Sequence, residues 1–193
     1  DAAAEIPPLA HLRRFTDEGA DLVIFSGGKD LGGPQSSGLI TGRRDLIDRC
    51  RRHASPNYSL GRSMKVGKEE IAGFVVALEA YLAQDEAAEL AGWEAMVAAL
   101  VTRLNALPGV RAQRVMLTGP GIRPVTIPRA AVTWDPERIP LTLTEVARRL
   151  LAGDPAVAVG QSATALLLNP QTLGPGEELS VAERLSAVLA APS

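Results

Sequence analysis

The chain has 193 residues, a formal net charge of −2 and 46% hydrophobic residues, enough to bury one large core or two small ones. No apolar run approaches the roughly 20 residues of a membrane-spanning helix, so we expect no membrane span and no membrane partner. The single cysteine, Cys50, excludes a disulfide within the chain and favours a reducing compartment, which predicts a cytoplasmic protein.

The first predicted elements alternate between helix and strand. A helix over residues 8–18 ends at Gly19, and a short apolar run at 21–25 predicts a strand covered on both faces. A glycine-rich loop then leads to a second strand at 38–41 and a basic helix at 43–53. Because the loop is too short for a helical crossover, we expect the two strands to be antiparallel.

The later elements follow a loop at 55–61. A long helical stretch begins at residue 66 or 67 and runs towards residue 107, with a possible break near Gln84 and Asp85. The pattern beyond it predicts a small α+β domain in which Thr142 or Thr144 caps the first helix. Its expected strands are 110–117, 125–127, 130–134, 157–159 and 165–168, and its expected helices are 144–151 and 177–189.

One lysine, Lys29, lies in the glycine-rich loop directly after the first strand. The surrounding glycines let the backbone approach a ligand closely. A lysine at the end of a buried strand suits Schiff-base chemistry, because desolvation favours the neutral amine, which is the nucleophilic form. We therefore interpret Lys29 as a catalytic residue.

The segment Ser26-Gly-Gly-Lys-Asp-Leu-Gly-Gly-Pro-Gln35 resembles the pyridoxal-phosphate lysine loop of fold-type-I enzymes. The resemblance is to the branch that holds bacterial selenocysteine synthase and D-glucosaminate-6-phosphate ammonia-lyase. A second segment, Gly61-Arg-Ser-Met-Lys-Val-Gly-Lys-Glu-Glu-Ile71, resembles the ammonia-lyase side more than the selenium-transferase side. The cofactor that this resemblance implies is pyridoxal 5'-phosphate, bound to Lys29.

The resemblance also implies an α/β fold class and a domain organisation. Residues 1–66 would be the C-terminal part of a large cofactor-binding domain with a mostly parallel sheet. Residues 67–193 would form the long linking helix and the small α+β domain. Family members are much longer than this chain, so we expect it to be the C-terminal part of a protein whose first half holds the phosphate-cupping loop and the residue stacked on the cofactor ring.

Asp1 and Ala3 gain roles from the same resemblance. Such enzymes pair an aspartate with the pyridine nitrogen of the cofactor, and Asp1 has the matching position before the lysine. A carboxylate there keeps the nitrogen protonated, which lets the ring withdraw charge from the substrate. The alternative for Asp1 is a solvated chain terminus. The small side chains of Ala2 and Ala3 would fit beneath the flat ring.

Ser26 and Gly33 are further candidates for cofactor binding. Fold-type-I enzymes often place a hydroxyl three residues before the lysine, on the cofactor phosphate. Together with free backbone N–H groups of Gly27 and Gly28, the Ser26 hydroxyl suits a dianion. Gly33 would line the same site or that of a neighbouring subunit, although a tight hairpin would also need glycine there.

Three cations precede or begin the helix near residue 67, where they oppose the helix dipole unless acids or a bound anion compensate. The functional interpretation is that Arg62 and Lys65 bind a substrate carboxylate or phosphate, since arginine makes bidentate contacts. Glu69 and Glu70 are the competing partners. We interpret Lys68 as a surface residue.

Other polar residues carry no clear site. His11 and His53 lack metal-ligand spacing, so we expect no zinc site and place both on helix surfaces. The basic run 43–52 contains Asp45 and Asp48 and no aromatic residue. That pattern favours a solvated helix face over a nucleic-acid partner.

The predicted function is that of a pyridoxal-phosphate lyase. The reaction would be an α,β-elimination that releases ammonia from a small amino acid or an amino sugar acid such as D-glucosaminate 6-phosphate. Two alternatives stay open: a β-replacement like that of the selenium transferases, and a non-catalytic fragment that serves as an oligomerisation module. The resemblance further implies a homo-oligomer, at least a dimer, because such sites form between two subunits.

Overall fold

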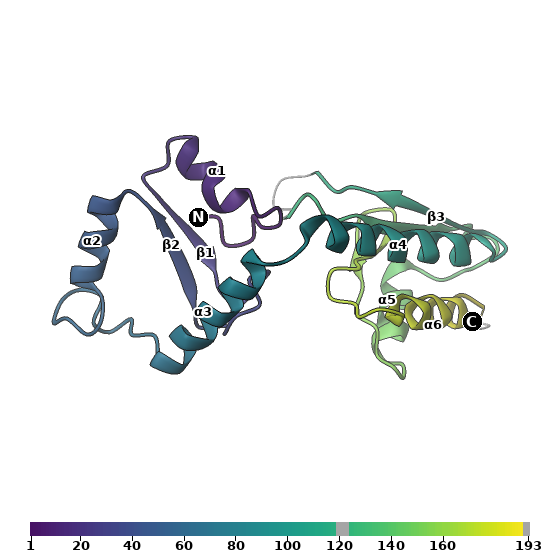
Figure 1. Cartoon of the computed structure of the whole chain (residues 1–193). Coiled ribbons are helices and arrows are strands. Elements are labelled where there is room, and N and C mark those ends of the chain that lie inside the picture. The colour runs from purple at the N-terminus through teal and green to yellow at the C-terminus, as the bar shows by residue number, and fades with distance from the viewer. Residues whose placement is uncertain (119–123, 191–193) are drawn as a thin grey trace. The chain divides into compact units, whose positions relative to one another are not determined.

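The computed structural model describes residues 1–118 and 124–190, which form two compact units (Figure 1). Unit 1 comprises residues 1–86 with residue 124, and unit 2 comprises residues 87–118 and 125–190. Each unit has a hydrophobic core of its own. Among the helices of the described ranges, none combines the length and the apolar character that crossing a membrane requires.

Unit 1 is built around a β-hairpin. Its elements are α1 (His11–Asp17), β1 (Leu22–Ser26), β2 (Gly38–Gly42), α2 (Arg44–His53) and α3 (Lys68–Leu82). The two strands pair in antiparallel register from Leu22 opposite Gly42 to Ser26 opposite Gly38, as the short loop predicted. The mostly parallel sheet is wrong for the described residues, because the strand pairs of both sheets are antiparallel.

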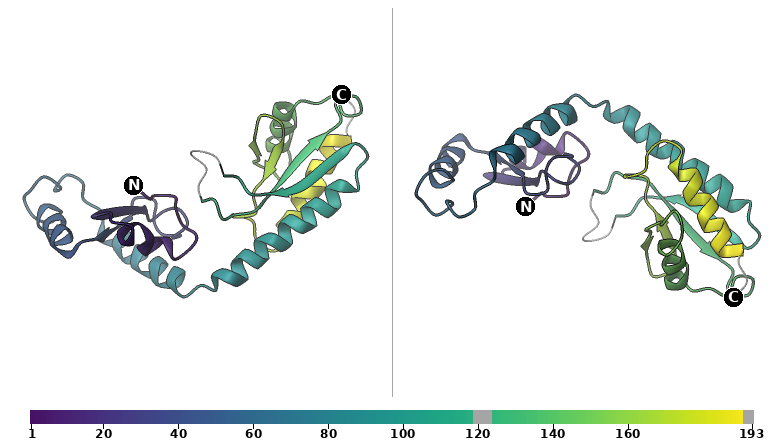
Figure 2. Two further views of the ribbon diagram at one scale, coloured as in Figure 1. Left: turned by 90° about the horizontal axis from the view of Figure 1, so that it is seen from above. Right: turned by 90° about the horizontal axis from the view of Figure 1, so that it is seen from below.

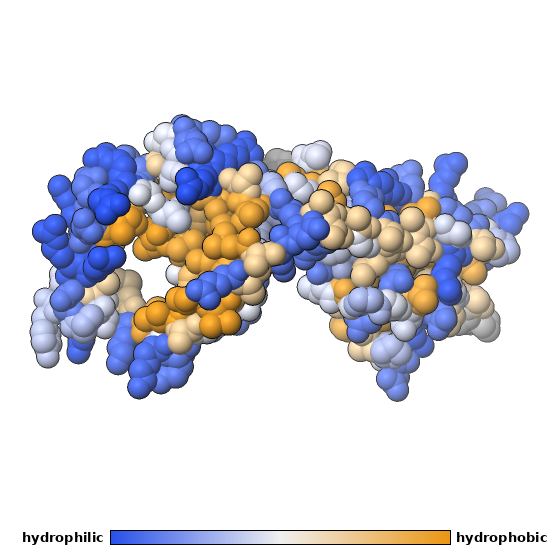
Figure 3. Space-filling model, in the orientation of Figure 1, coloured by the Kyte–Doolittle hydropathy of each residue, from blue (hydrophilic) through white to orange (hydrophobic). Residues whose placement is uncertain are grey.

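The hairpin is covered on one face and open on the other. Side chains alternate along a strand, and Val23 and Phe25 are buried with Ile6 and Phe74 in the core of unit 1. Ile24 on the opposite face is 51% exposed. The sequence-based expectation of a strand buried on both faces is therefore wrong here. Figure 3 shows apolar side chains at the surface of this part of the chain.

The long helical stretch is two helices. Helix α3 ends at Leu82, and α4 (Glu86–Asn105) begins after a short break, as the polar residues Gln84 and Asp85 predicted. Helix α4 packs Val97, Leu100 and Leu104 into the core of unit 2.

Unit 2 combines one sheet with three helices. Its further elements are β3 (Val110–Val115), β4 (Arg129–Trp134), α5 (Leu143–Leu151), β5 (Gly160–Gln161), β6 (Leu166–Leu168) and α6 (Glu177–Ala190). The strand order is β3-β4-β6-β5. Two predicted strands are wrong: residues 125 and 126 form a turn, and 157–159 precede β5 without joining the ladder.

The two faces of the unit 2 sheet differ. Ala130 and Val132 of β4 pack into the core with Leu100 and Leu185. Helices α4 and α6 lie on the same side of the sheet (Figure 2), with an ion pair of 3.9 Å between Arg103 and Glu183.

Thr142 is the N-cap of α5, accepting a hydrogen bond from the Glu145 N–H at 3.2 Å. The capping predicted for Thr142 is confirmed.

Candidate functional site

The lysine loop folds back on itself between β1 and β2. The Gly27 N–H donates to the Ser37 carbonyl at 2.9 Å, and the Gly33 N–H donates to the Gly27 carbonyl at 2.7 Å. The Gly32 N–H donates to the carbonyl of Lys29 at 2.8 Å, with Gly32 at φ +67°, a left-handed conformation that favours glycine. These bonds give Lys29 a fixed backbone position directly after the strand.

Tight packing within the loop explains two of its glycines. A Cβ on Gly27 would lie 2.9 Å from the carbonyl carbon of Ser37 and would also clash with its hydroxyl. A Cβ on Gly28 would lie 2.5 Å from the Cα of Gln35. The loop needs these glycines for its own fold. The prediction of a free Gly27 N–H is wrong, because Ser37 accepts its hydrogen bond.

The Asp1 segment lies along the strand that leads to the lysine. The Ala2 N–H donates to the Ile24 carbonyl at 2.8 Å, and Asp1 Oδ1 accepts a hydrogen bond from the Ala3 N–H at 2.9 Å. Ala2 is buried, whereas Asp1 is exposed. The hairpin therefore carries the Asp1 and Ala3 segment beside β1 and the half-buried Ser26 at its end.

Lys29 itself is exposed. The desolvation that the sequence led us to expect is not supplied by the described residues around it. Its roles and those of Asp1, Ser26, Ala3 and Gly33 stay predictions. The structure gives Gly33 a packing environment in which an added Cβ would meet Phe74 at 3.3 Å and the Gly27 carbonyl at 3.0 Å.

Arg62 and Lys65 follow α2 in an exposed segment. Arg62 donates a hydrogen bond to the Pro56 carbonyl at 2.8 Å, and its guanidinium lies 5.1 Å from the ring centroid of Tyr58. Lys68, at the start of α3, is 3.8 Å from Glu69 and highly exposed, in line with a surface residue. Glu69 and Glu70 occupy the first turn of α3, where acids offset the cations opposing the helix dipole.

A hollow of about 590 Å³ adjoins the lysine loop. Ser37 and Gly38 at the start of β2, Ser55 after α2, and Lys65 line it together with Phe74 of α3. Ser37 and Phe74 are also the neighbours that restrict Gly27, so these two residues connect the hollow to the loop. Sequence reasoning missed both residues, because their role depends on long-range packing. Lys29 and Asp1 do not line the hollow.

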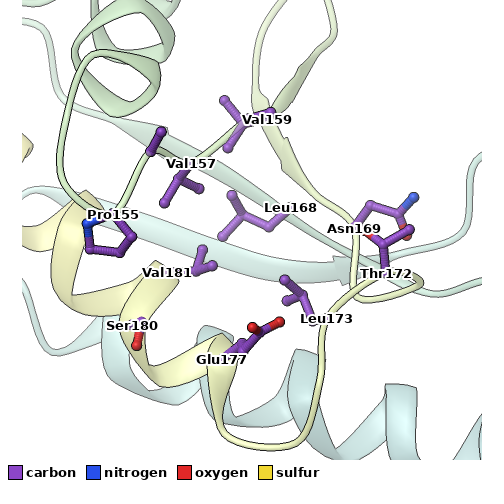
Figure 4. A pocket seen from close by; sticks show the side chains of 12 residues that line it. Pro155, Val157, Val159, Leu168, Asn169, Thr172, Leu173, Glu177, Ser180 and Val181 are labelled. Carbon is purple, nitrogen blue, oxygen red and sulfur yellow. The ribbon is translucent and has the colours of Figure 1, made fainter.

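Unit 2 contains a separate cavity of about 340 Å³ (Figure 4). Its wall is mainly apolar, with Val157, Leu168, Leu173 and Val181 around it. The Glu177 carboxylate, which points into this region, accepts a hydrogen bond from the Gly174 N–H at 2.8 Å at the start of α6. None of the predicted site residues lines this cavity.

The histidines are structural or surface residues. His11 is 8% exposed, so its predicted place on a helix surface is wrong. Its Nδ1 lies 2.5 Å from the Glu5 carbonyl, and its Nε2 lies 3.1 Å from Arg14, which explains the burial of a polar ring. His53 is exposed and contacts Ser59. Over residues 1–118 and 124–190, no group of three or more histidine, cysteine or acidic side chains could hold a metal ion.

Comparison with known proteins now identifies the family. A model of the family described as L-seryl-tRNA selenium transferase (SelA) matches residues 5–118, more than half of the chain. The chain belongs to this family. The resemblance seen in the lysine loop is thus confirmed, and the relatives are fold-type-I pyridoxal-phosphate enzymes.

The names of individual relatives specify different reactions. A 5'-C-glycyluridine monooxygenase-decarboxylase from Streptomyces sp is 36% identical over 196 residues, which cover 98% of this chain and 45% of that protein. A D-glucosaminate-6-phosphate ammonia lyase from Salmonella typhimurium is 44% identical over 81 residues, which cover 42% of this chain and 20% of that protein.

A solved structure of a D-glucosaminate-6-phosphate ammonia-lyase is similar with a TM-score of 0.71 and 28% identity. The similarity covers 97% of this chain and 47% of that one, and it confirms the α/β fold class. The chain spans about half the length of the relatives that it matches along most of its own length.

Proposed function

We propose that this chain carries the lysine-bearing part of a pyridoxal-phosphate enzyme that acts at the α-carbon of an amino acid or a derivative of one. The lysine hairpin is the observation that supports this proposal most. It combines an exposed amine at Lys29, the hydroxyl of Ser26 at the end of β1, and the carboxylate of Asp1 on a segment hydrogen-bonded to β1. An amine, a hydroxyl donor and a carboxylate on one small element fit such a cofactor.

The names of the relatives support the substrate class. A seryl group, a glycyl group and glucosaminate each carry an amino group on the carbon next to a carboxyl carbon. We therefore propose an α-amino acid, an ester of one, or an amino sugar acid as the substrate. The reactions in these names differ, whereas the amino group next to a carboxyl carbon is common to all three.

For the reaction we propose an α,β-elimination that ends in release of ammonia. Lys29 would take the α-proton, a β-hydroxyl of the substrate would leave as water, and hydrolysis of the resulting imine would release ammonia. Asp1 would hold a proton at the cofactor's ring nitrogen, and Ser26 would donate a hydrogen bond to its phosphate. The bound cofactor supplies the electron sink for the charge that develops at the α-carbon. The second candidate is a β-replacement of the selenium-transferase type, which the match to that family model favours.

Two cations are proposed to bind an anionic group of the substrate. Lys65 lines the hollow beside the lysine loop. Arg62 lies three residues before it, with a guanidinium suited to bidentate contact with a carboxylate or phosphate. Ala3, on the segment hydrogen-bonded to β1, and Gly33, in the lysine loop, are proposed to contact the cofactor.

The assembly remains a proposal of its own. The exposed face of the hairpin supports a homo-oligomer, because Ile24 and Ile40 lie directly opposite each other on it and are 51% and 45% exposed. We do not propose a nucleic-acid partner for α2, because Asp45 and Asp48 interrupt its basic residues and no aromatic residue lies among them. We also retain the proposal of a cytoplasmic enzyme.

Reduction with borohydride tests the central assignment. In the natural protein loaded with pyridoxal phosphate, we expect mass spectrometry to place the reduced pyridoxyl adduct on Lys29. Lys29→Ala should keep its fold, because the side chain is exposed, and should lose activity by several orders of magnitude. Lys68→Ala is the matched control for the adduct and should keep it on Lys29. An adduct on Lys65 or Lys68 instead would overturn the assignment.

A further inference from the structure

Unit 2 contains one buried guanidinium that lacks an acidic partner. Arg129, the first residue of β4, is 8% exposed. Its Nη1 donates a hydrogen bond of 3.2 Å to the Ile127 carbonyl. No ion pair joins it to a carboxylate among the described residues. A buried charge without a counterion is unfavourable unless something outside the unit neutralises it.

The sheet register explains why no acid lies beside Arg129. Side chains opposite each other on neighbouring strands share a face, and alternate residues of one strand do so too. The face that carries Arg129 therefore holds Ala131 and Thr133 of β4, and none of the residues that share it on β3 and β6 is acidic. They are Arg111, Gln113, Val115 and Leu167. The helices and the apolar core lie on the other face, with Ala130 and Val132.

The free nitrogens of Arg129 are not sealed inside the protein. Among described residues, the enclosed side-chain polar atoms without a partner are Thr41 Oγ1 and Arg184 Nε. Arg129 has five N–H donors, and one of them makes a hydrogen bond, to the Ile127 carbonyl. None of its nitrogens is both enclosed and without a partner, so its other N–H groups reach the surface. Burial lowers the pKa of Arg129. A nearby carboxylate would raise this pKa, so the direction of the shift agrees with the lack of an acidic partner.

We propose that Arg129 binds an oxyanion, a carboxylate or phosphate group of a ligand, at the start of β4 on the sheet face away from the helices. The guanidinium presents a planar fork that matches such groups bidentately. The anion supplies the negative charge that unit 2 lacks at this position. This site belongs to unit 2 and does not depend on the proposed role of Lys29.

Thermal unfolding of the natural protein tests the site. Inorganic phosphate and acetate are compared with sodium chloride at equal ionic strength, for the wild type, Arg129→Met and a control, Arg111→Met. Arg111 is exposed on the same face, opposite Thr133, which strand geometry places about 13 Å along β4 from Arg129. The substitution Arg111→Met removes the same charge as Arg129→Met. We expect phosphate or acetate to raise the Tm of the wild type and of Arg111→Met more than that of Arg129→Met.

The Tm without added oxyanion gives an independent outcome. Removal of an unpaired buried charge should leave the Tm of Arg129→Met equal to or above that of the wild type. A lower Tm in chloride alone would mean that the guanidinium is an internal structural link, which overturns the proposal. Equal oxyanion-dependent rises in the wild type and in Arg129→Met would overturn it as well.

A second measurement applies if Arg129→Met does not fold. The Nε–H signal of Arg129 in the wild type can be assigned by its loss in Arg129→Lys and followed by NMR during titration with phosphate and with acetate. A saturable shift with either anion supports the site, and the difference between the two identifies which group it prefers. An unchanged signal with both anions contradicts the proposal.

Discussion

Single residues in unit 2 show how local charge is matched within a helix. Glu145, in the first turn of α5, is bound by Arg148 at 2.9 Å and by Arg149 at 2.7 Å. Hydrogen bonds from these two guanidinium groups hold the pKa of the Glu145 carboxyl down at about 2, with Arg148 the larger influence. An acid in the first turn also interacts favourably with the helix dipole.

The Glu145 pairing predicts a pH dependence of stability. A carboxyl whose folded-state pKa is depressed stabilises the fold above its unfolded pKa of 4.5, and that stabilisation is lost as the pH falls towards about 2. We expect Glu145→Gln to lower Tm at pH 7, with the difference from the wild type shrinking over this range. Glu137→Gln, which removes an exposed carboxylate, is the control. A pH-independent difference for Glu145→Gln would contradict the assignment.

The site residues show what a sequence does and does not predict at this scale. Lys29 follows a strand and lies among glycines, and both features are local, so its backbone position was predictable. Its exposure was not, because burial of a side chain depends on parts of the fold that meet it from elsewhere in the sequence. The burial of His11 was missed for the same reason, since it depends on the Glu5 carbonyl and on Arg14.

At the scale of elements, the lysine hairpin is specified by its loop. Backbone hydrogen bonds link Gly27 to both Ser37 and Gly33, so the two ends of the loop are fixed to each other. Antiparallel pairing was predictable from loop length alone. The strands expected at 125–127 and 157–159 were not found, because an apolar run becomes a strand only where a neighbour completes its ladder.

Two glycines of opposite environment test this view of the loop. Gly27→Ala should destabilise unit 1 by about 1–3 kcal/mol, because its Cβ would clash with Ser37. Gly92→Ala should stabilise α4 by about 0.5–1 kcal/mol, since this helical position has open space around it. Urea unfolding of both variants measures the changes. A neutral Gly27→Ala would show that the loop relaxes without cost.

At the scale of the whole molecule, the chain has two cores and not one. The core of unit 1 contains Val23 and Phe25, and the core of unit 2 contains Leu104 and Leu185. The break between α3 and α4 was predictable from the polar residues Gln84 and Asp85. The parallel sheet expected from the resemblance was wrong here, because the described strands pair only with antiparallel neighbours.

Separate cores predict separate responses to core substitutions. Leu185→Ala should destabilise unit 2 by about 2–5 kcal/mol and leave amide exchange in β1 and β2 unchanged. Val23→Ala is the reciprocal variant and should speed exchange in the hairpin while β4 and β6 keep their protection. Native-state hydrogen exchange measures both. Equal loss of protection in both units after either substitution would show that they unfold together.

The packing inside the lysine loop affects how enzyme activity can be assigned to homologues from their sequences. Gly27 and Gly28 are small because Ser37 and Gln35 press against them, whatever residue stands at position 29. A descendant that exchanged Lys29 for another residue would remain under selection to keep both glycines in order to fold. The glycine pattern would then persist in proteins that have lost the catalytic lysine. Among newly sequenced members of this family, the lysine itself must be present before an inherited loop is taken as a sign of a working enzyme.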